Sequence, residues 1–80
     1  MLEMRPNCER CDQDLAADEP GALICTFECT FCTDCGEHLH STCPNCGGQL
    51  VTRPTRARTL WKRHPPSESR VFNPGLRERG

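Results

Sequence analysis

The 80-residue chain has little of what a protein normally uses to build a hydrophobic core. Aromatic residues make up 5% of it, there is one tryptophan and no tyrosine, and all hydrophobic residues together reach 35%. No apolar run approaches the roughly 18 residues of a membrane-spanning helix. These shortages argue against a membrane protein, a two-domain enzyme and any fold that rests on a large apolar interior. Such a small domain usually needs disulfides, bound metal or a partner to fold.

A secretory signal peptide is also missing. The chain begins Met1–Cys8 without a basic stretch followed by an apolar segment. We therefore expect a cytoplasmic protein in a reducing compartment, where structural disulfides are rare and dense cysteines more often bind metal. The alternative is a secreted domain cross-linked by disulfides, and the missing signal and the cysteine pairs described below argue against it.

The charges are divided along the chain, which the net charge of −1 conceals. Residues 1–50 carry nine acidic residues and two arginines, whereas residues 51–80 carry eight basic residues and two acidic ones. All eight cysteines lie in the acidic part, and four of the seven prolines lie in the basic part. We therefore predict a zinc-binding module over residues 1–52 and a basic, proline-containing, flexible tail over residues 53–80.

Short local patterns predict little regular secondary structure. Pro20-Gly21 marks a turn, and the β-prone residues 22–27 that follow are expected to form one short strand. Asp34 followed three residues later by Glu37 is typical of a helix start, which predicts one or two helical turns after it.

Cysteine pairs are the strongest signal in the sequence. Four pairs have two residues between their members: Cys8/Cys11, Cys29/Cys32, Cys32/Cys35 and Cys43/Cys46. The remaining cysteine, Cys25, is separated from Cys29 by three residues. Two intervening residues let the backbone curl so that both sulfurs face one point. The glycines that follow two of these pairs, Gly36 and Gly47, are expected to supply a positive φ. Zinc takes four thiolates tetrahedrally, so we expect two closed sites and two Zn²⁺ ions per chain, with iron as a chemical alternative.

The order of the cysteines resembles the RING-finger family, as do the Phe31-Cys32 step and the Cys43-Pro44-Asn45-Cys46 pair. This resemblance implies a cross-brace, with one zinc on Cys8, Cys11, Cys32 and Cys35 and the other on Cys25, Cys29, Cys43 and Cys46. Two consecutive sites, each built from four successive cysteines, are the alternative, and local spacing does not separate the two arrangements. The implied fold class is a small metal-stabilised, RING-like domain with a short β-hairpin, one short helix and little regular secondary structure.

A closer resemblance covers the chain to about Pro54. The stretches Met1–Cys11, Phe27–Cys32 and Cys43–Gly48 are similar to short bacterial proteins known as domain-of-unknown-function family 1272, which are thought to bind zinc in a RING-like fold. The resemblance implies a bacterial source and a fold, but no activity.

Enzymatic activity is not expected. Ligase RINGs place an apolar residue before the second cysteine, where this chain has Arg10, and often a basic residue after the eighth, where it has Gly47. Fold similarity alone does not carry ligase function, and a site of four thiolates leaves no coordination position open for catalysis. His38 and His40 are interpreted as solvent-facing, because eight cysteines already fill both sites, and His64 is interpreted as solvated.

The expected function is structural zinc binding in the service of protein recognition, by a monomer that does not associate with membranes. Nucleic-acid binding is the alternative, because residues 53–64 hold five cations and Trp61, which suit phosphates and bases. The acidic module argues against it, since its charge repels the same phosphates. A ubiquitin-ligase-like activity and a zinc or redox switch are more distant alternatives.

Overall fold

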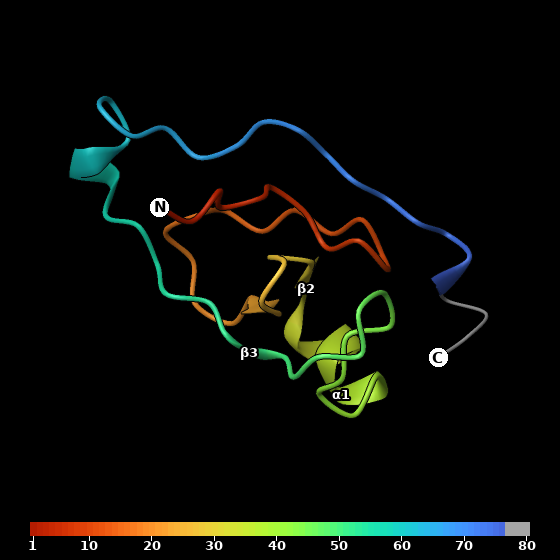
Figure 1. Ribbon diagram of the computed structural model, residues 1–80. Coiled ribbons are helices and arrows are strands. Elements are labelled where there is room, and N and C mark those ends of the chain that lie inside the picture. Colours follow the sequence, from red (N-terminus) through yellow and green to blue (C-terminus); the bar gives the residue numbers. More distant parts are fainter. Residues whose placement is uncertain (77–80) are drawn as a thin grey trace.

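The computed structural model describes residues 1–76, so the last four residues of the predicted tail lie outside the described part (Figure 1). Regular secondary structure in residues 1–76 is sparse, as expected for this fold class. It consists of β1 (Leu23–Ile24), β2 (Thr30–Phe31), α1 (Thr33–His38), β3 (Val51–Thr52) and the 3-10 turn η1 (Arg58–Leu60).

The three strands form one antiparallel sheet in the order β2-β1-β3. Leu23 of β1 lies opposite Phe31 on one side and Thr52 on the other, so the predicted hairpin is confirmed and β3 is an addition to it. The strand predicted over residues 22–27 is shorter than expected. Its end is a tight turn in which the Glu28 N–H donates to the Cys25 carbonyl at 3.0 Å, because this part of the chain curls around a cysteine pair.

The predicted helix is present, but its start and the role of its glycine differ from expectation. Cys32 is the N-cap, with its thiol accepting from the Cys35 N–H at 3.4 Å, and Asp34 lies within the first turn. Gly36 is helical and provides close packing instead of a positive φ, because a Cβ there would collide with the side chain of Leu23. Gly47 does have a positive φ, of 76°, as predicted.

Cysteine side chains occupy much of the interior. Half of the ten residues in the buried core cluster are cysteines, and Phe31 is the one aromatic residue among them; the cluster is Cys8, Leu15, Ala22, Cys25, Phe31, Cys32, Cys35, Cys43, Leu50 and Leu76. Hydrophobic burial stabilises a fold in proportion to apolar area, and this cluster offers few large apolar side chains. The thiols therefore lie where a larger domain would place its core.

Residues 53–76, which we call the C-terminal segment, run back along the N-terminal residues (Figure 1). The Ser67 N–H donates to the Glu3 carbonyl and the Asn73 N–H to the Glu9 carbonyl, each at 2.8 Å. Leu76 is buried in the core cluster. The predicted division into a module and a flexible tail stays a prediction. In the structure, the C-terminal segment lies against residues of the predicted module.

Arg53 anchors the beginning of the C-terminal segment and is 2% exposed. Its guanidinium donates to the carbonyls of Arg5 at 2.8 Å, Leu15 at 3.3 Å and Ala16 at 3.4 Å. Burial lowers its pKa, which the negative charge of Glu28 partly opposes. The Arg53 side chain thus provides hydrogen-bond donors to three carbonyls of the N-terminal residues. The sequence alone did not predict these contacts.

Replacing Arg53 by methionine is expected to lower the free energy of unfolding by about 2–3 kcal/mol, because buried carbonyls lose their donors while the aliphatic stem is kept. The measurement is urea unfolding of the metal-loaded protein, followed by the fluorescence of Trp61. Arg63→Met serves as the matched control, since Arg63 is exposed and has no ion pair within residues 1–76. Equal midpoints for the two variants would show that the Arg53 contacts contribute nothing.

Candidate metal centres

The first cysteine group joins two parts of the chain that lie far apart in sequence. The Sγ atoms of Cys8, Cys11, Cys32 and Cys35 all lie within 4.8 Å of one another. Cys11 Sγ and Cys32 Sγ are 3.7 Å apart. A tetrahedral zinc site with Zn–S bonds of about 2.3 Å requires sulfurs about 3.8 Å apart, whereas a disulfide requires about 2.05 Å. All eight cysteines are free thiols, so this spacing fits a metal ion and no disulfide.

Local backbone geometry turns the first pair of thiols inward. The Asp12 N–H donates to the Cys8 carbonyl at 2.8 Å, which closes a tight turn around Cys11. Asp12 takes the positive φ, 65°, that follows this pair. The second pair lies at the junction of β2 and α1, where the N-cap position of Cys32 holds its sulfur beside the first turn of the helix.

Arg10 adds a positive charge to the first group. Its guanidinium donates to Cys35 Sγ at 3.4 Å, while its buried Nε has no hydrogen-bond partner within the described residues. Four thiolates around a divalent ion carry a net charge of −2, so a neighbouring cation stabilises the loaded site. Sequence analysis noted Arg10 only as a departure from ligase RINGs, and its contact with Cys35 was missed.

The second cysteine group is smaller and more open. The Sγ atoms of Cys25, Cys43 and Cys46 lie within 4.8 Å of one another, and Cys46 is exposed. Cys29 is not within that limit of all three. The Gly48 N–H donates to Cys46 Sγ at 3.4 Å, which directs this sulfur toward the group. Cys29 as the fourth ligand therefore stays a prediction.

The two groups interleave along the chain. Cys8 shares its group with Cys32 and Cys35, while Cys25, which lies between them in sequence, belongs to the other group. Two consecutive sites would instead place Cys25 beside Cys8. The grouping of these seven thiols differs from that of two consecutive sites and is compatible with a cross-brace, in which Cys29 would be the eighth ligand.

Burial decides the protonation of several thiols when no metal is bound. It raises the pKa of Cys8 and Cys32, and that of Cys43 to about 12, because a buried thiolate loses its hydration. For Cys11 and Cys25, burial acts in the same direction, but hydrogen bonds from backbone N–H groups and neighbouring thiols together outweigh it and lower the pKa. Loading either group with metal must therefore displace protons from buried sulfurs.

Glu9 is a buried carboxylate beside the second group, 2% exposed, that sequence analysis did not single out. It accepts hydrogen bonds from the Thr30 N–H at 3.0 Å, the Arg5 guanidinium at 3.2 Å, the Asn45 amide at 3.3 Å and the Asn73 amide at 3.5 Å. These partners belong to β2, the N-terminal residues, the loop between two cysteines and the C-terminal segment. Glu9 thus ties four parts of the chain together, and no local sequence signal marks it.

The histidines do not join either cysteine group within residues 1–76. His38 and His40 are exposed, in agreement with their interpretation as solvent-facing residues, and His64 is exposed near η1. Within the same residues, every helix is too short and too polar to cross a membrane.

Comparison with known proteins places the chain in a family. The family model described as "Protein of unknown function (DUF1272)" matches residues 1–56. An uncharacterized protein of Rhizobium meliloti (strain 1021) is 57% identical over 75 residues, which cover 92% of this chain and 89% of that protein, so the similarity extends into the C-terminal segment. No solved structure matches the chain. The predicted resemblance is thereby confirmed, and this chain belongs to the DUF1272 family of proteins of unknown function.

Proposed function

We propose that this protein is a non-enzymatic zinc-binding module that recognises another protein, with two zinc ions per chain as its structural cross-links. The observation that best supports this proposal is the pair of interleaved cysteine groups in an interior that is otherwise poor in apolar side chains. Sets of thiolates alone are typical of structural zinc, and a closed four-thiolate site binds no water or substrate. The proposal includes Cys29 as the fourth ligand of the second ion and a monomeric protein.

Arg53 and Arg58, two of the five cations proposed for phosphate binding, have partners within the chain that a phosphate would have to displace, which supports protein recognition over the nucleic-acid alternative. Arg53 donates to buried carbonyls, and Arg58 pairs with Asp18 at 2.7 Å. Farther along the C-terminal segment, Arg70 pairs with Asp12 at 3.0 Å and with Asp14 at 2.7 Å. Each internal carboxylate or carbonyl competes with a phosphate for the same donors, so Arg53, Arg58 and Arg70 are less available for phosphate contacts.

Trp61 is also engaged within the chain. Its indole N–H donates to the Arg56 carbonyl at 3.0 Å, and the guanidinium of Arg58 lies 4.9 Å from the ring centroid. A base that stacked on this ring would have to displace Arg58 from one face. The tryptophan therefore contributes to the local fold of η1.

A capture experiment distinguishes the two functions. The zinc-loaded protein is immobilised and exposed to lysate with and without nuclease, and a chelator-treated sample serves as the control. We expect a protein partner that is retained after nuclease treatment and lost with the metal. Loss of all capture after nuclease treatment would favour nucleic-acid binding instead.

A further inference from the structure

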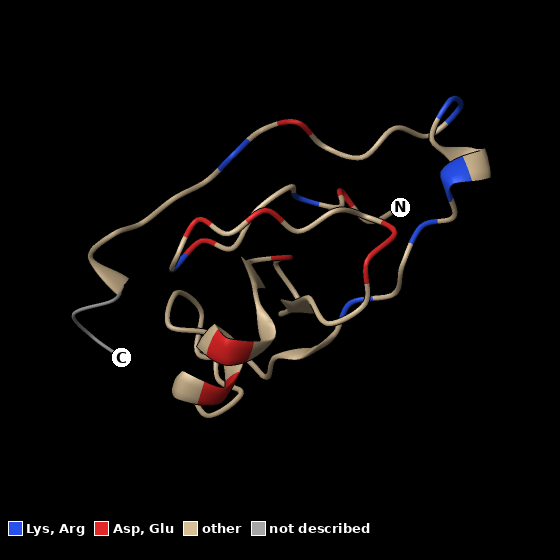
Figure 2. Cartoon of the chain, turned by 180° about the vertical axis from the view of Figure 1, so that it is seen from behind, with Lys and Arg blue, Asp and Glu red and all other residues tan. Residues whose placement is uncertain are grey.

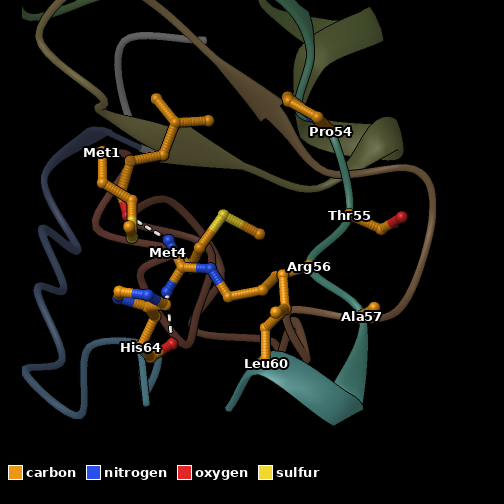
Figure 3. Close-up of a pocket in the computed structure, with 9 residues that line it drawn as sticks. Met1, Met4, Pro54, Thr55, Arg56, Ala57, Leu60 and His64 are labelled. Carbon is orange, nitrogen blue, oxygen red and sulfur yellow. Dashed lines mark hydrogen bonds between the residues drawn. The ribbon is translucent and has the colours of Figure 1, made fainter.

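An apolar cavity of about 410 Å³ lies between the N-terminal residues and the C-terminal segment (Figure 3). Pockets of this size fall within the range that accommodates a ligand or a few peptide side chains. Six of its nine lining residues are apolar: Met1, Leu2, Met4, Pro54, Ala57 and Leu60. Met1 is 87% exposed and Leu60 48% exposed, whereas Met4 is 3% exposed, so exposed apolar side chains surround a buried base.

Arg56 is held rigidly at the side of this cavity. Its guanidinium donates to the Leu2 carbonyl at 2.6 Å and to the His64 carbonyl at 2.9 Å, as the dashed lines in Figure 3 show. Within residues 1–76, no carboxylate pairs with it. A fixed cation without a counter-ion therefore lies beside an apolar surface.

Further positive charge lies just past η1. Lys62 and Arg63 are exposed and have no ion pair within the described residues, and they precede His64 of the cavity lining. Figure 2 shows basic segments on and just past η1, and acidic segments both on α1 and near the N-terminus. Glu3 pairs with Arg5 and Asp18 with Arg58, so the unpaired charge of Lys62 and Arg63 is complemented by a negative charge.

We propose that this cavity binds a short acidic segment of a partner protein, with an apolar side chain of that segment inserted against Met4 and Leu60. Carboxylates of the segment face Lys62 and Arg63, while Arg56, whose guanidinium already donates to carbonyls, contributes its positive charge. The inference rests on the proposed function, since it assigns the surface and the chemistry of the recognised protein. Nucleic acid suits this surface less well, because a sugar-phosphate chain offers no aliphatic side chain to an apolar cavity.

A random library of short peptides displayed on phage tests this assignment with the zinc-loaded full chain as bait. We expect enrichment of peptides that combine acidic residues with a large apolar residue. Leu60→Ser should weaken their binding about tenfold, because it removes most of one apolar contact. Val71→Ser is the matched control, since Val71 is a partly exposed apolar residue of the same segment outside the cavity. The double variant Lys62→Gln/Arg63→Gln should weaken binding and reduce its salt dependence.

Several outcomes would overturn the assignment. They are the absence of enrichment, enriched peptides without acidic residues, and equal binding to Leu60→Ser and Val71→Ser. Tight binding of single-stranded oligothymidylate that depends on Lys62 and Arg63 but not on Leu60 would identify a nucleic-acid surface instead. A partner captured from lysate that resists nuclease and binds Leu60→Ser normally would refute this cavity while leaving protein recognition intact. Absence of any nuclease-resistant partner would count against the proposed function itself.

Discussion

Removal of both metal ions is expected to unfold the chain, with loss of backbone amide dispersion for residues 8–50. The interior offers little apolar burial, because half of its buried cluster consists of cysteines that would be left as unlinked thiols. Structural zinc contributes about 10–16 kcal/mol of apparent binding free energy in small zinc domains, which is comparable to or larger than the total stability of an ordinary domain. The metal-free chain should therefore lack a stable fold. Amide NMR spectra before and after a strong chelator measure this directly.

Native mass spectrometry of the same samples provides the metal count. We expect two zinc ions per chain before chelation, none after it, and recovery of the dispersed spectrum when zinc is returned. Cobalt substitution should give the intense charge-transfer absorption of thiolate ligands at both sites. A metal-free chain that keeps its dispersed spectrum would contradict the proposal. Disulfides in protein purified anaerobically from a reducing cytosol would contradict it as well.

Paired cysteine substitutions are expected to separate the two possible ligand arrangements. The double variant Cys8→Ser/Cys35→Ser should retain one metal ion, because both sulfurs belong to the first group and the second group is left complete. Two consecutive sites would lose both ions in this variant, since the two cysteines would then serve different metals. Native mass spectrometry gives the number of ions in each case.

The reciprocal variant provides the control. Cys8→Ser/Cys25→Ser removes one sulfur from each group of the structure and should therefore lose both ions. Consecutive pairing predicts the opposite, because both cysteines would belong to one site and the other ion would remain. The two variants remove the same number of thiols, so a difference between them reports the arrangement and not the loss of ligand capacity. One retained ion in the second variant would refute the cross-brace.

The thiols of the second cysteine group are more exposed to solvent than those of the first. Metal content should therefore be measured before the protein is exposed to oxidants. Cys46 is exposed and Cys29 half-buried, whereas in the first group only Cys11 is more than slightly accessible. Accessible thiolates react faster with oxidants than buried ones.

The sequence by itself determined those features that depend on a few neighbouring residues. A two-residue spacing between cysteines directs both sulfurs to one point, so free, clustered thiols followed from the spacing of Cys8 and Cys11 and of Cys43 and Cys46. The positive φ of Gly47 and the short helix after Cys32 are equally local. The family also followed, because the cysteine order is long and specific.

Only the tertiary structure decided which distant residues meet. Spacing within a pair says nothing about which other pair completes the group, because that depends on how the whole chain closes its loops. Strand β3 is too short to show a periodic pattern and exists through its pairing with β1. Charge counts likewise do not show that Arg53 meets carbonyls and that Arg70 meets carboxylates far away in sequence. Local conformation is set by neighbours along the chain, whereas these contacts are set by the path of the complete fold.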